Sequence, residues 1–143
     1  KPKAKLLIIG DGQYRKHLED CIKKENLKED VIFTGMMDNP FIALSVCDIY
    51  CHISLNEACP VAPLEAMIAG KPVIASNDGW LPEIITDGLD GILVDSNPDS
   101  VAKAILMLLD DSNLMQNLSR NATITVTSKF SWDSIVREYE KLY

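Results

Sequence analysis

Basic charge and long apolar runs are scarce in this sequence. It carries 14 Lys and Arg residues against 21 Asp and Glu residues, so its net charge is −7. Nucleic-acid surfaces need a basic face, and this balance therefore argues against nucleic acid as a partner. No apolar run reaches the roughly 18 residues of a membrane-spanning helix. The segment 1–10 also has too short an apolar core for a signal peptide. A cytoplasmic location is expected.

Metal-binding and common nucleotide-binding signatures are also missing. None of the 4 cysteines belongs to a Cys-x-x-Cys pair, and neither His17 nor His52 is spaced with them as zinc ligands usually are. We therefore expect no metal and no disulfide. The dinucleotide fingerprint starts with Gly10 and Gly12 but fails at Arg15, where a third glycine is required. No Gly-x-x-x-x-Gly-Lys-Ser/Thr loop occurs either, which excludes the usual nucleoside triphosphatases.

What is present is an alternation of apolar runs and amphipathic segments. The 143 residues suffice for one domain and are too few for two ordinary ones, and no internal boundary is expected. Strands alternating with helices predict an α/β fold, with a parallel sheet covered by helices on both faces. The expected strands cover residues 4–9, 31–34, 48–53, 72–76 and 92–94. The expected helices cover residues 13–25, 41–46, 60–69, 81–86, 99–109, 113–128 and 132–142.

Local signals mark several helix ends. Pro60 suits the first turn of a helix, and Gly70 suits the left-handed residue just past the end of the same helix. Capping sequences precede three later helices, at residues 96–98, at residues 111–112 and at Ser131. Trp132, directly after the last of these, is expected to pack as the anchor of the final helix.

Candidate binding groups lie in the loops that follow the strands, because ligands in such folds bind beyond the carboxyl ends of the strands. These loops cover residues 10–12, 35–37, 54–60 and 76–79. The helix after the third loop is mostly apolar, yet Glu57 lies at its entry and Glu65 inside it. An ionised carboxylate in apolar surroundings is costly unless something pairs with it or hydrogen-bonds to it. That cost makes both residues candidates for a site.

The two carboxylates permit two interpretations. Acidic residues in the first turns of a helix often do no more than complement the helix dipole. The same helix start presents free backbone N–H groups, which favour phosphate. Carboxylates for hydroxyls beside amides for phosphate would suit a sugar nucleotide. Residue chemistry alone leaves both interpretations open.

The run from Ser54 to Ser76 resembles the Glu-x7-Glu signature of the retaining group 1 glycosyltransferases, with Glu57 and Glu65 as its two acids. Other landmarks of the family occur in the same order along the chain. They are Leu-Ile-Ile-Gly-x-Gly at 7–12, Val-x-Phe-x-Gly at 31–35, the Pro-Glu-Ile-Ile run at 82–94 and Phe-Ser-Trp at 130–132. The resemblance covers essentially the whole chain. It implies the C-terminal, donor-binding half of an enzyme with two Rossmann-like domains facing a cleft, the GT-B architecture.

The resemblance also implies roles for individual residues. Glu57 is the catalytic candidate and would contact hydroxyls of the transferred sugar. Glu65 would accept hydrogen bonds from both ribose hydroxyls, which suits a carboxylate with two acceptor oxygens. Backbone amides at the helix start would face the diphosphate, and the loop after residue 35 would lie near the base. The further donor-binding candidates are Gly12, Gly35, Met36, Met37, Ser54, Cys59, Pro60, Val61 and Ala62.

Two departures from the family pattern stand out. Pro60 occupies a position where the family usually has Gly, and proline brings no N–H to the phosphate loop. The chain also lacks the earlier strand and helix that carry an Arg and a Lys for the diphosphate. We therefore expect a piece of a longer protein whose N-terminal domain binds a glycan or lipid acceptor. We expect little transferase activity from the chain alone, and any peripheral membrane contact through the other half.

The implied reaction is transfer of a hexose from a nucleotide diphosphate to an acceptor hydroxyl with retained configuration, without a metal or other cofactor. Three alternatives remain open. A sugar-nucleotide 2-epimerase-like enzyme would yield an epimerised nucleotide, and a glycogen or starch synthase-like polymerase would yield a long glucan. A non-catalytic sugar-nucleotide-binding module is the third, and intact Glu57 and Glu65 speak against it.

Overall fold

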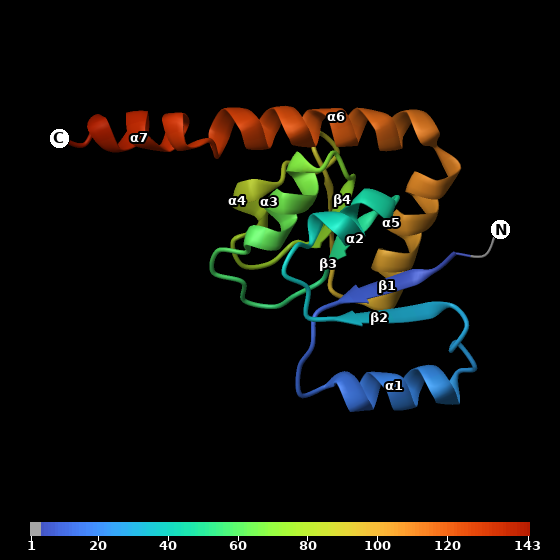
Figure 1. Cartoon of the computed structure of the whole chain (residues 1–143). Helices are drawn as coiled ribbons and strands as arrows, with labels where there is room; N and C mark the ends of the chain where they lie inside the picture. Colours follow the sequence, from blue (N-terminus) through green and yellow to red (C-terminus); the bar gives the residue numbers. More distant parts are fainter. Residues whose placement is uncertain (1–3) are drawn as a thin grey trace. The chain divides into compact units, whose positions relative to one another are not determined.

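The computed structural model describes residues 4–143, and the chain divides into two compact units at the junction between Cys47 and Asp48. Each unit holds a parallel sheet with helices beside it, so the expected α/β class is confirmed (Figure 1). The sequence predicts one continuous sheet, whereas the structure has two separate sheets. Among the described residues, the strands form one sheet of two strands and one sheet of three, with no ladder joining the sheets.

The first unit contains a two-stranded parallel sheet and two helices. Leu6 lies opposite Val31, and Ile8 lies opposite Phe33. The carboxyl ends of the strands are joined by a hydrogen bond of 2.9 Å from the Gly10 N–H to the Gly35 carbonyl. The elements are β1 (Leu6–Ile9), α1 (Arg15–Lys24), β2 (Val31–Gly35) and α2 (Phe41–Val46).

The second unit contains a three-stranded parallel sheet in the order β3-β4-β5. All four residues of β4 are buried, because helices cover both faces of this strand. One face packs in a cluster that includes Ile74, Ile92 and Leu108. The elements are β3 (Tyr50–His52), α3 (Val61–Ile68), β4 (Val73–Ser76), α4 (Leu81–Ile84), β5 (Ile92–Val94), α5 (Pro98–Asp110), α6 (Ser112–Lys129) and α7 (Trp132–Glu140).

Helix α3 is one residue shorter at each end than the predicted range 60–69. Pro60 is the N-cap, in an extended conformation with φ −74° and ψ 120°, and Val61 is the first helical residue. Gly70 has φ +69°, as expected for the left-handed residue after the helix. Helix α6 packs against α3, and its Thr123 hydroxyl donates to the Met67 carbonyl at 3.0 Å. Helix α6 therefore satisfies carbonyl groups at the C-terminal end of α3.

The three predicted capping sequences are confirmed. The Asn97 side chain accepts from the Ser100 N–H, and the Ser131 hydroxyl accepts from the Ser134 N–H. Asp111 accepts from two backbone N–H groups at the start of α6. Each bond satisfies N–H groups that have no partner inside their own helix.

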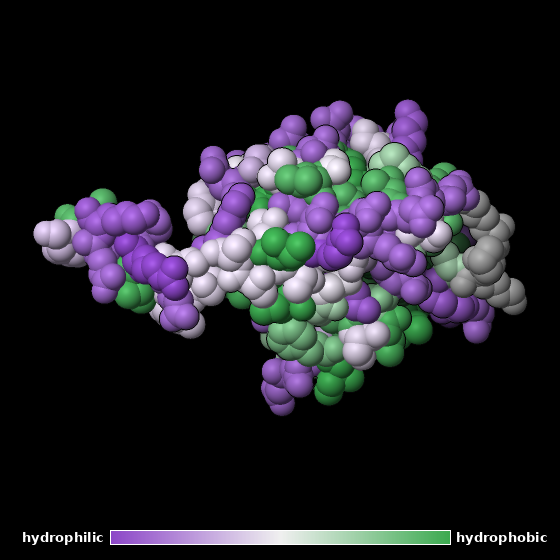
Figure 2. Space-filling model, turned by 90° about the horizontal axis from the view of Figure 1, so that it is seen from above, coloured by the Kyte–Doolittle hydropathy of each residue, from purple (hydrophilic) through white to green (hydrophobic). Residues whose placement is uncertain are grey.

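Helix α7 differs from expectation. Trp132 is 82% exposed, so the prediction that it anchors the last helix is wrong. Val136 and Tyr139 are also exposed, and all three lie on one stripe of the helix at spacings of four and three residues. Figure 2 shows this helix standing out from the rest of its unit, with hydrophobic side chains at its surface. None of the helices described over residues 4–143 combines the length and apolar character needed to cross a bilayer.

A buried carboxylate joins the loop before β5 to helix α6. Asp90 is 1% exposed. One of its oxygens accepts from the Thr86 N–H and the other from the Thr125 hydroxyl, each at 2.7 Å. A buried carboxylate is tolerated only when it is hydrogen-bonded in this way.

A close backbone contact fixes the loop that carries Glu57. Gly79 has φ +57°, and a Cβ atom built on it would lie 2.6 Å from the Glu57 carbonyl oxygen. The next N–H, that of Trp80, donates to the same carbonyl at 3.0 Å. Glycine is therefore required at position 79 for both its conformation and its lack of a side chain.

Removing the Thr125 hydroxyl is expected to destabilise the second unit. Thr125→Val keeps the side-chain shape but takes the donor from Asp90, so the free energy of unfolding should fall by about 1.5–3 kcal/mol. Thr127→Val is the matched control, because that hydroxyl donates to carbonyls of its own helix on an exposed face. The control should change stability by less than about 0.5 kcal/mol. Urea unfolding followed by circular dichroism compares them, and equal losses would contradict the structural role of Asp90.

Gly79→Ala is expected to destabilise the protein more than Gly88→Ala. Both glycines have positive φ, but a Cβ at Gly88 meets no atom within 4 Å. The left-handed conformation costs an alanine about 1–2 kcal/mol at either position. The clash with Glu57 should add about 1–3 kcal/mol at position 79 alone. The same unfolding measurement tests this, and an equal effect of the two substitutions would show that the contact is unimportant.

Candidate functional site

Two loops of the second unit meet at the carboxyl edge of its sheet. Strands β3 and β4 are parallel neighbours, so the loops that follow them emerge at the same edge. The Ser76 hydroxyl joins them, because it accepts from the Ser54 N–H at 3.0 Å and donates to the Ser54 carbonyl. The contact of Glu57 with Gly79 and Trp80 joins them again three residues later. The predicted site residues Ser54 and Glu57 are thus held at one edge.

The Glu57 side chain is half-buried, with 32% of it exposed, and it contacts a histidine. Its Oε1 atom lies 3.3 Å from Nε2 of His52. The other ring nitrogen of His52, Nδ1, lies 3.3 Å from the Tyr50 hydroxyl. Sequence analysis did not include His52 among the candidate binding residues. The available signal was that Tyr50 and His52 alternate on one strand, and so share a face, just before the Glu57 loop.

Glu65 lies in the second turn of α3 and is half-buried. Within residues 4–143, its carboxylate makes no hydrogen bond or ion pair. Every fully buried side-chain nitrogen or oxygen of the described chain has a hydrogen-bond partner. The Glu65 oxygens therefore reach solvent, and a carboxylate so placed can accept hydrogen bonds from a bound ligand.

Both carboxylates act on the same tyrosine. Burial raises the pKa of Tyr50 to about 12, and the negative charges of Glu65 and Glu57 add to this effect. Tyr50 lies opposite Val73 in the sheet, and α3 packs against β3 and β4. Glu57 and Glu65 are eight positions apart, yet both lie within electrostatic range of one hydroxyl. The structure brings them to one region of the second unit.

The start of α3 completes this part of the candidate site. Val61 and Ala62 are its first two residues, so their N–H groups have no acceptor within the helix. These N–H groups and the helix dipole favour an anion at this end. Cys59 is exposed beside them, and Pro60 is buried at the N-cap. The spacing of four residues places Glu65 on the same helix face as Val61.

The other predicted positions belong to the first unit. Gly35, at the end of β2, has φ +70° and is bonded to Gly10, so it shares an edge with the turn that contains Gly12. Met36 is 79% exposed and Met37 is half-buried. The structure thus assembles Gly12, Gly35, Met36 and Met37 within one unit and the remaining candidates within the other.

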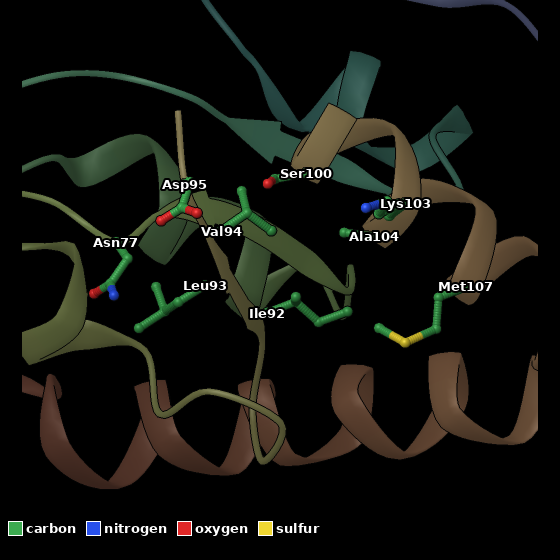
Figure 3. Close-up of a pocket in the computed structure, with 9 residues that line it drawn as sticks. All are labelled: Asn77, Ile92, Leu93, Val94, Asp95, Ser100, Lys103, Ala104 and Met107. Atoms are coloured by element: carbon green, nitrogen blue, oxygen red, sulfur yellow. The ribbon is translucent and has the colours of Figure 1, made fainter. Parts of the chain in front are cut away.

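Two hollows of the second unit contain none of the predicted site residues. One, of about 350 Å³, lies between β5 and α5, with polar groups of Asn77, Asp95 and Lys103 around apolar side chains (Figure 3). The other, of about 470 Å³, is mostly apolar and includes Ile53 and Pro98. Neither offers a half-buried carboxylate without a partner. From residue 4 to the C-terminus, no three His, Cys, Asp or Glu side chains are grouped so that they could hold a metal ion.

Known proteins resemble the chain in both sequence and structure. It is 35% identical to an uncharacterized glycosyltransferase of Methanocaldococcus jannaschii over 143 residues, which cover 98% of this chain and 37% of that protein. It is 33% identical to N-acetyl-alpha-D-glucosaminyl L-malate synthase of Bacillus anthracis over 141 residues, with 98% and 37% covered.

A solved structure has the same fold. The Anabaena protein Alr3699/HepE in complex with UDP-glucose matches with a TM-score of 0.91 and 25% identity, over 99% of this chain and 41% of that chain. The chain thus spans well under half the length of these relatives. A family model described as glycosyl transferases group 1 matches residues 1–125. The chain belongs to the group 1 glycosyl transferases, which have the GT-B fold.

Proposed function

We propose that this chain binds the donor of a retaining hexosyltransferase, a sugar attached to a nucleoside diphosphate. One observation carries the proposal: the Glu65 carboxylate has no hydrogen-bond partner within the described chain and lies one turn from the open start of α3. A nucleoside diphosphate offers both matching groups, ribose hydroxyls for a carboxylate and phosphate for helix amides. The UDP-glucose bound by the similar Anabaena protein supports this class of ligand.

Each residue at this edge then has a defined part. Glu65 accepts hydrogen bonds from the ribose, and the N–H groups of Val61 and Ala62 face the diphosphate. Glu57 contacts hydroxyls of the sugar. Because the leaving diphosphate gains charge during transfer, fixed amide donors near it would stabilise the transition state more than the ground state. Ser54, Cys59 and Pro60 lie at the same edge of the second unit and would line the donor site. Gly12, Gly35, Met36 and Met37 remain predicted donor contacts of the first unit, by the family resemblance alone.

The proposal also covers where the acceptor binds and whether the configuration of the sugar is retained. The chain spans 37% of the first relatives, and the acceptor glycan or lipid would bind chiefly to a further domain. A diphosphate beside two carboxylates needs cations, and the family resemblance places these in a strand–helix unit that precedes the matched region. Transfer with retained configuration is the expected outcome for the complete enzyme.

Glu65→Gln is expected to weaken the binding of UDP and UDP-glucose by tenfold or more. The substitution removes the charge but keeps the shape of the acceptor, and hydrogen bonds to charged groups contribute about 1.5–3 kcal/mol. Isothermal titration calorimetry on the purified chain measures the affinities. Glu140→Gln, on the exposed end of α7, is the control and should leave both affinities unchanged.

A modified ligand locates the contact that Glu65 makes. In the wild-type chain, 2′-deoxy-UDP should bind several-fold more weakly than UDP, because one ribose hydroxyl is missing. In Glu65→Gln this preference should shrink, since the acceptor of that hydrogen bond has been weakened. An unchanged preference for UDP would show that Glu65 does not bind the ribose.

Donor binding is expected to need no divalent metal. Within this chain the proposed partners of the diphosphate are the amide groups at the start of α3, so chelation should leave binding intact. The affinity for UDP-glucose should therefore be the same in 1 mM EDTA and in 1 mM MgCl₂, within about twofold. A tenfold loss in EDTA would contradict this part of the proposal.

A further inference from the structure

We propose that His52 is a positioning residue that holds the Glu57 carboxylate for the donor sugar, and that Tyr50 sets the orientation of the imidazole. The proposal rests on the function proposed above for Glu57. It adds two residues that no part of the Glu-x7-Glu pattern contains. Their role follows from a chain of hydrogen bonds that runs from the middle of β3 to the loop at its end.

Two consecutive hydrogen bonds link the side chains of Tyr50, His52 and Glu57. Tyr50 and His52 lie on the same face of β3, with ring centroids 6.3 Å apart and planes inclined by 18°. The Tyr50 hydroxyl lies 3.3 Å from Nδ1 of His52, and Nε2 lies 3.3 Å from Oε1 of Glu57. Both distances are at the long end for hydrogen bonds.

The donor and the acceptor of each of these two hydrogen bonds follow from the chemistry of the groups. An ionised carboxylate only accepts hydrogen bonds, so Nε2 of His52 must donate to Glu57. In a neutral imidazole the other nitrogen is then an acceptor, which the Tyr50 hydroxyl can satisfy as donor. The pKa of Tyr50 near 12 keeps that hydroxyl protonated at physiological pH. The bonds therefore run from Tyr50 to His52 to Glu57.

Positioning matters because Glu57 lies on a loop, whereas His52 lies on a strand. Asn56, next to Glu57, has φ +58°, so the loop turns sharply at this point. His52 pairs with buried β4, opposite Ala75. Its bond to Oε1 restricts the rotamer of Glu57 and leaves the second carboxylate oxygen for a ligand. A group held from a rigid element is placed more precisely than one held by a loop alone.

Two substitutions of His52 separate positioning from folding. In His52→Gln the amide nitrogen can occupy the place of Nε2 and still donate to Glu57. In His52→Asn the side chain is too short to do so but can still accept from Tyr50. His52→Asn should reduce the affinity for UDP-glucose about fivefold or more and leave the affinity for UDP unchanged. His52→Gln should retain most of the affinity for both ligands, as measured by calorimetry.

The two outcomes that would overturn the proposal are distinct from failure to fold. Equal loss of UDP-glucose binding in His52→Gln and His52→Asn would mean that the donor to Glu57 is unimportant. Parallel loss of UDP and UDP-glucose binding would indicate a structural role of His52. Circular dichroism confirms that each variant is folded before binding is measured.

A measurement without ligand keeps this test separate from the proposed function. If the wild-type chain binds neither UDP nor UDP-glucose, the proposed donor-binding function is wrong. Nitrogen-15 NMR of the imidazoles still tests the hydrogen bonds from Tyr50 to His52 and from His52 to Glu57. His52 should have its proton on Nε2, and Tyr50→Phe should shift the Nδ1 resonance while His17 stays unchanged. A proton on Nδ1 of His52 in the wild-type chain, or no response to Tyr50→Phe, would overturn the proposal.

Discussion

The parallel pairing of β3 with β4 is the constraint on which the candidate site depends. Because the two strands run in the same direction, the loops after them emerge together, and the Glu57 loop can pack on the turn at Gly79. Strand β4 is buried on both faces, which makes it a rigid base for this edge. Helix α3 connects the same two strands and therefore places Glu65 within electrostatic range of Tyr50. Two acids that are eight positions apart in the chain thereby reach one region.

Much of this arrangement follows from local sequence signals. The α/β class and the group 1 family are confirmed, and helix α2 and strand β5 have the predicted limits. Capping residues and Gly70 act locally, so a single sequence is enough to place them. The division at Cys47 was not predicted, because periodicity shows that strands exist but not which strands share hydrogen bonds. Trp132 was misjudged for a related reason, since apolar character alone does not say what covers a side chain.

In the candidate site, too, some residues can be identified from the local sequence and others only from the folded structure. Glu57, Glu65 and the amides at the start of α3 could be named from residue type and spacing. His52 could not, because its importance comes from contacts of 3.3 Å to Tyr50 and Glu57 that depend on strand geometry and loop path. Buried or half-buried polar groups need partners, and those partners become visible only when the chain is folded. In the proposed function, the carboxylates of this edge bind hydroxyl groups of the ligand, and the amides at the start of α3 bind its phosphate.

Nuclear magnetic resonance of the wild-type chain titrated with UDP-glucose tests the central claim most directly. If Glu65 and the start of α3 form the donor site, the largest chemical-shift changes should fall on the amides of Val61, Ala62 and Glu65 and on the loop around Glu57. The amides of β5 and α5 that surround the hollow with Lys103 should change little. Changes confined to that hollow would contradict the account.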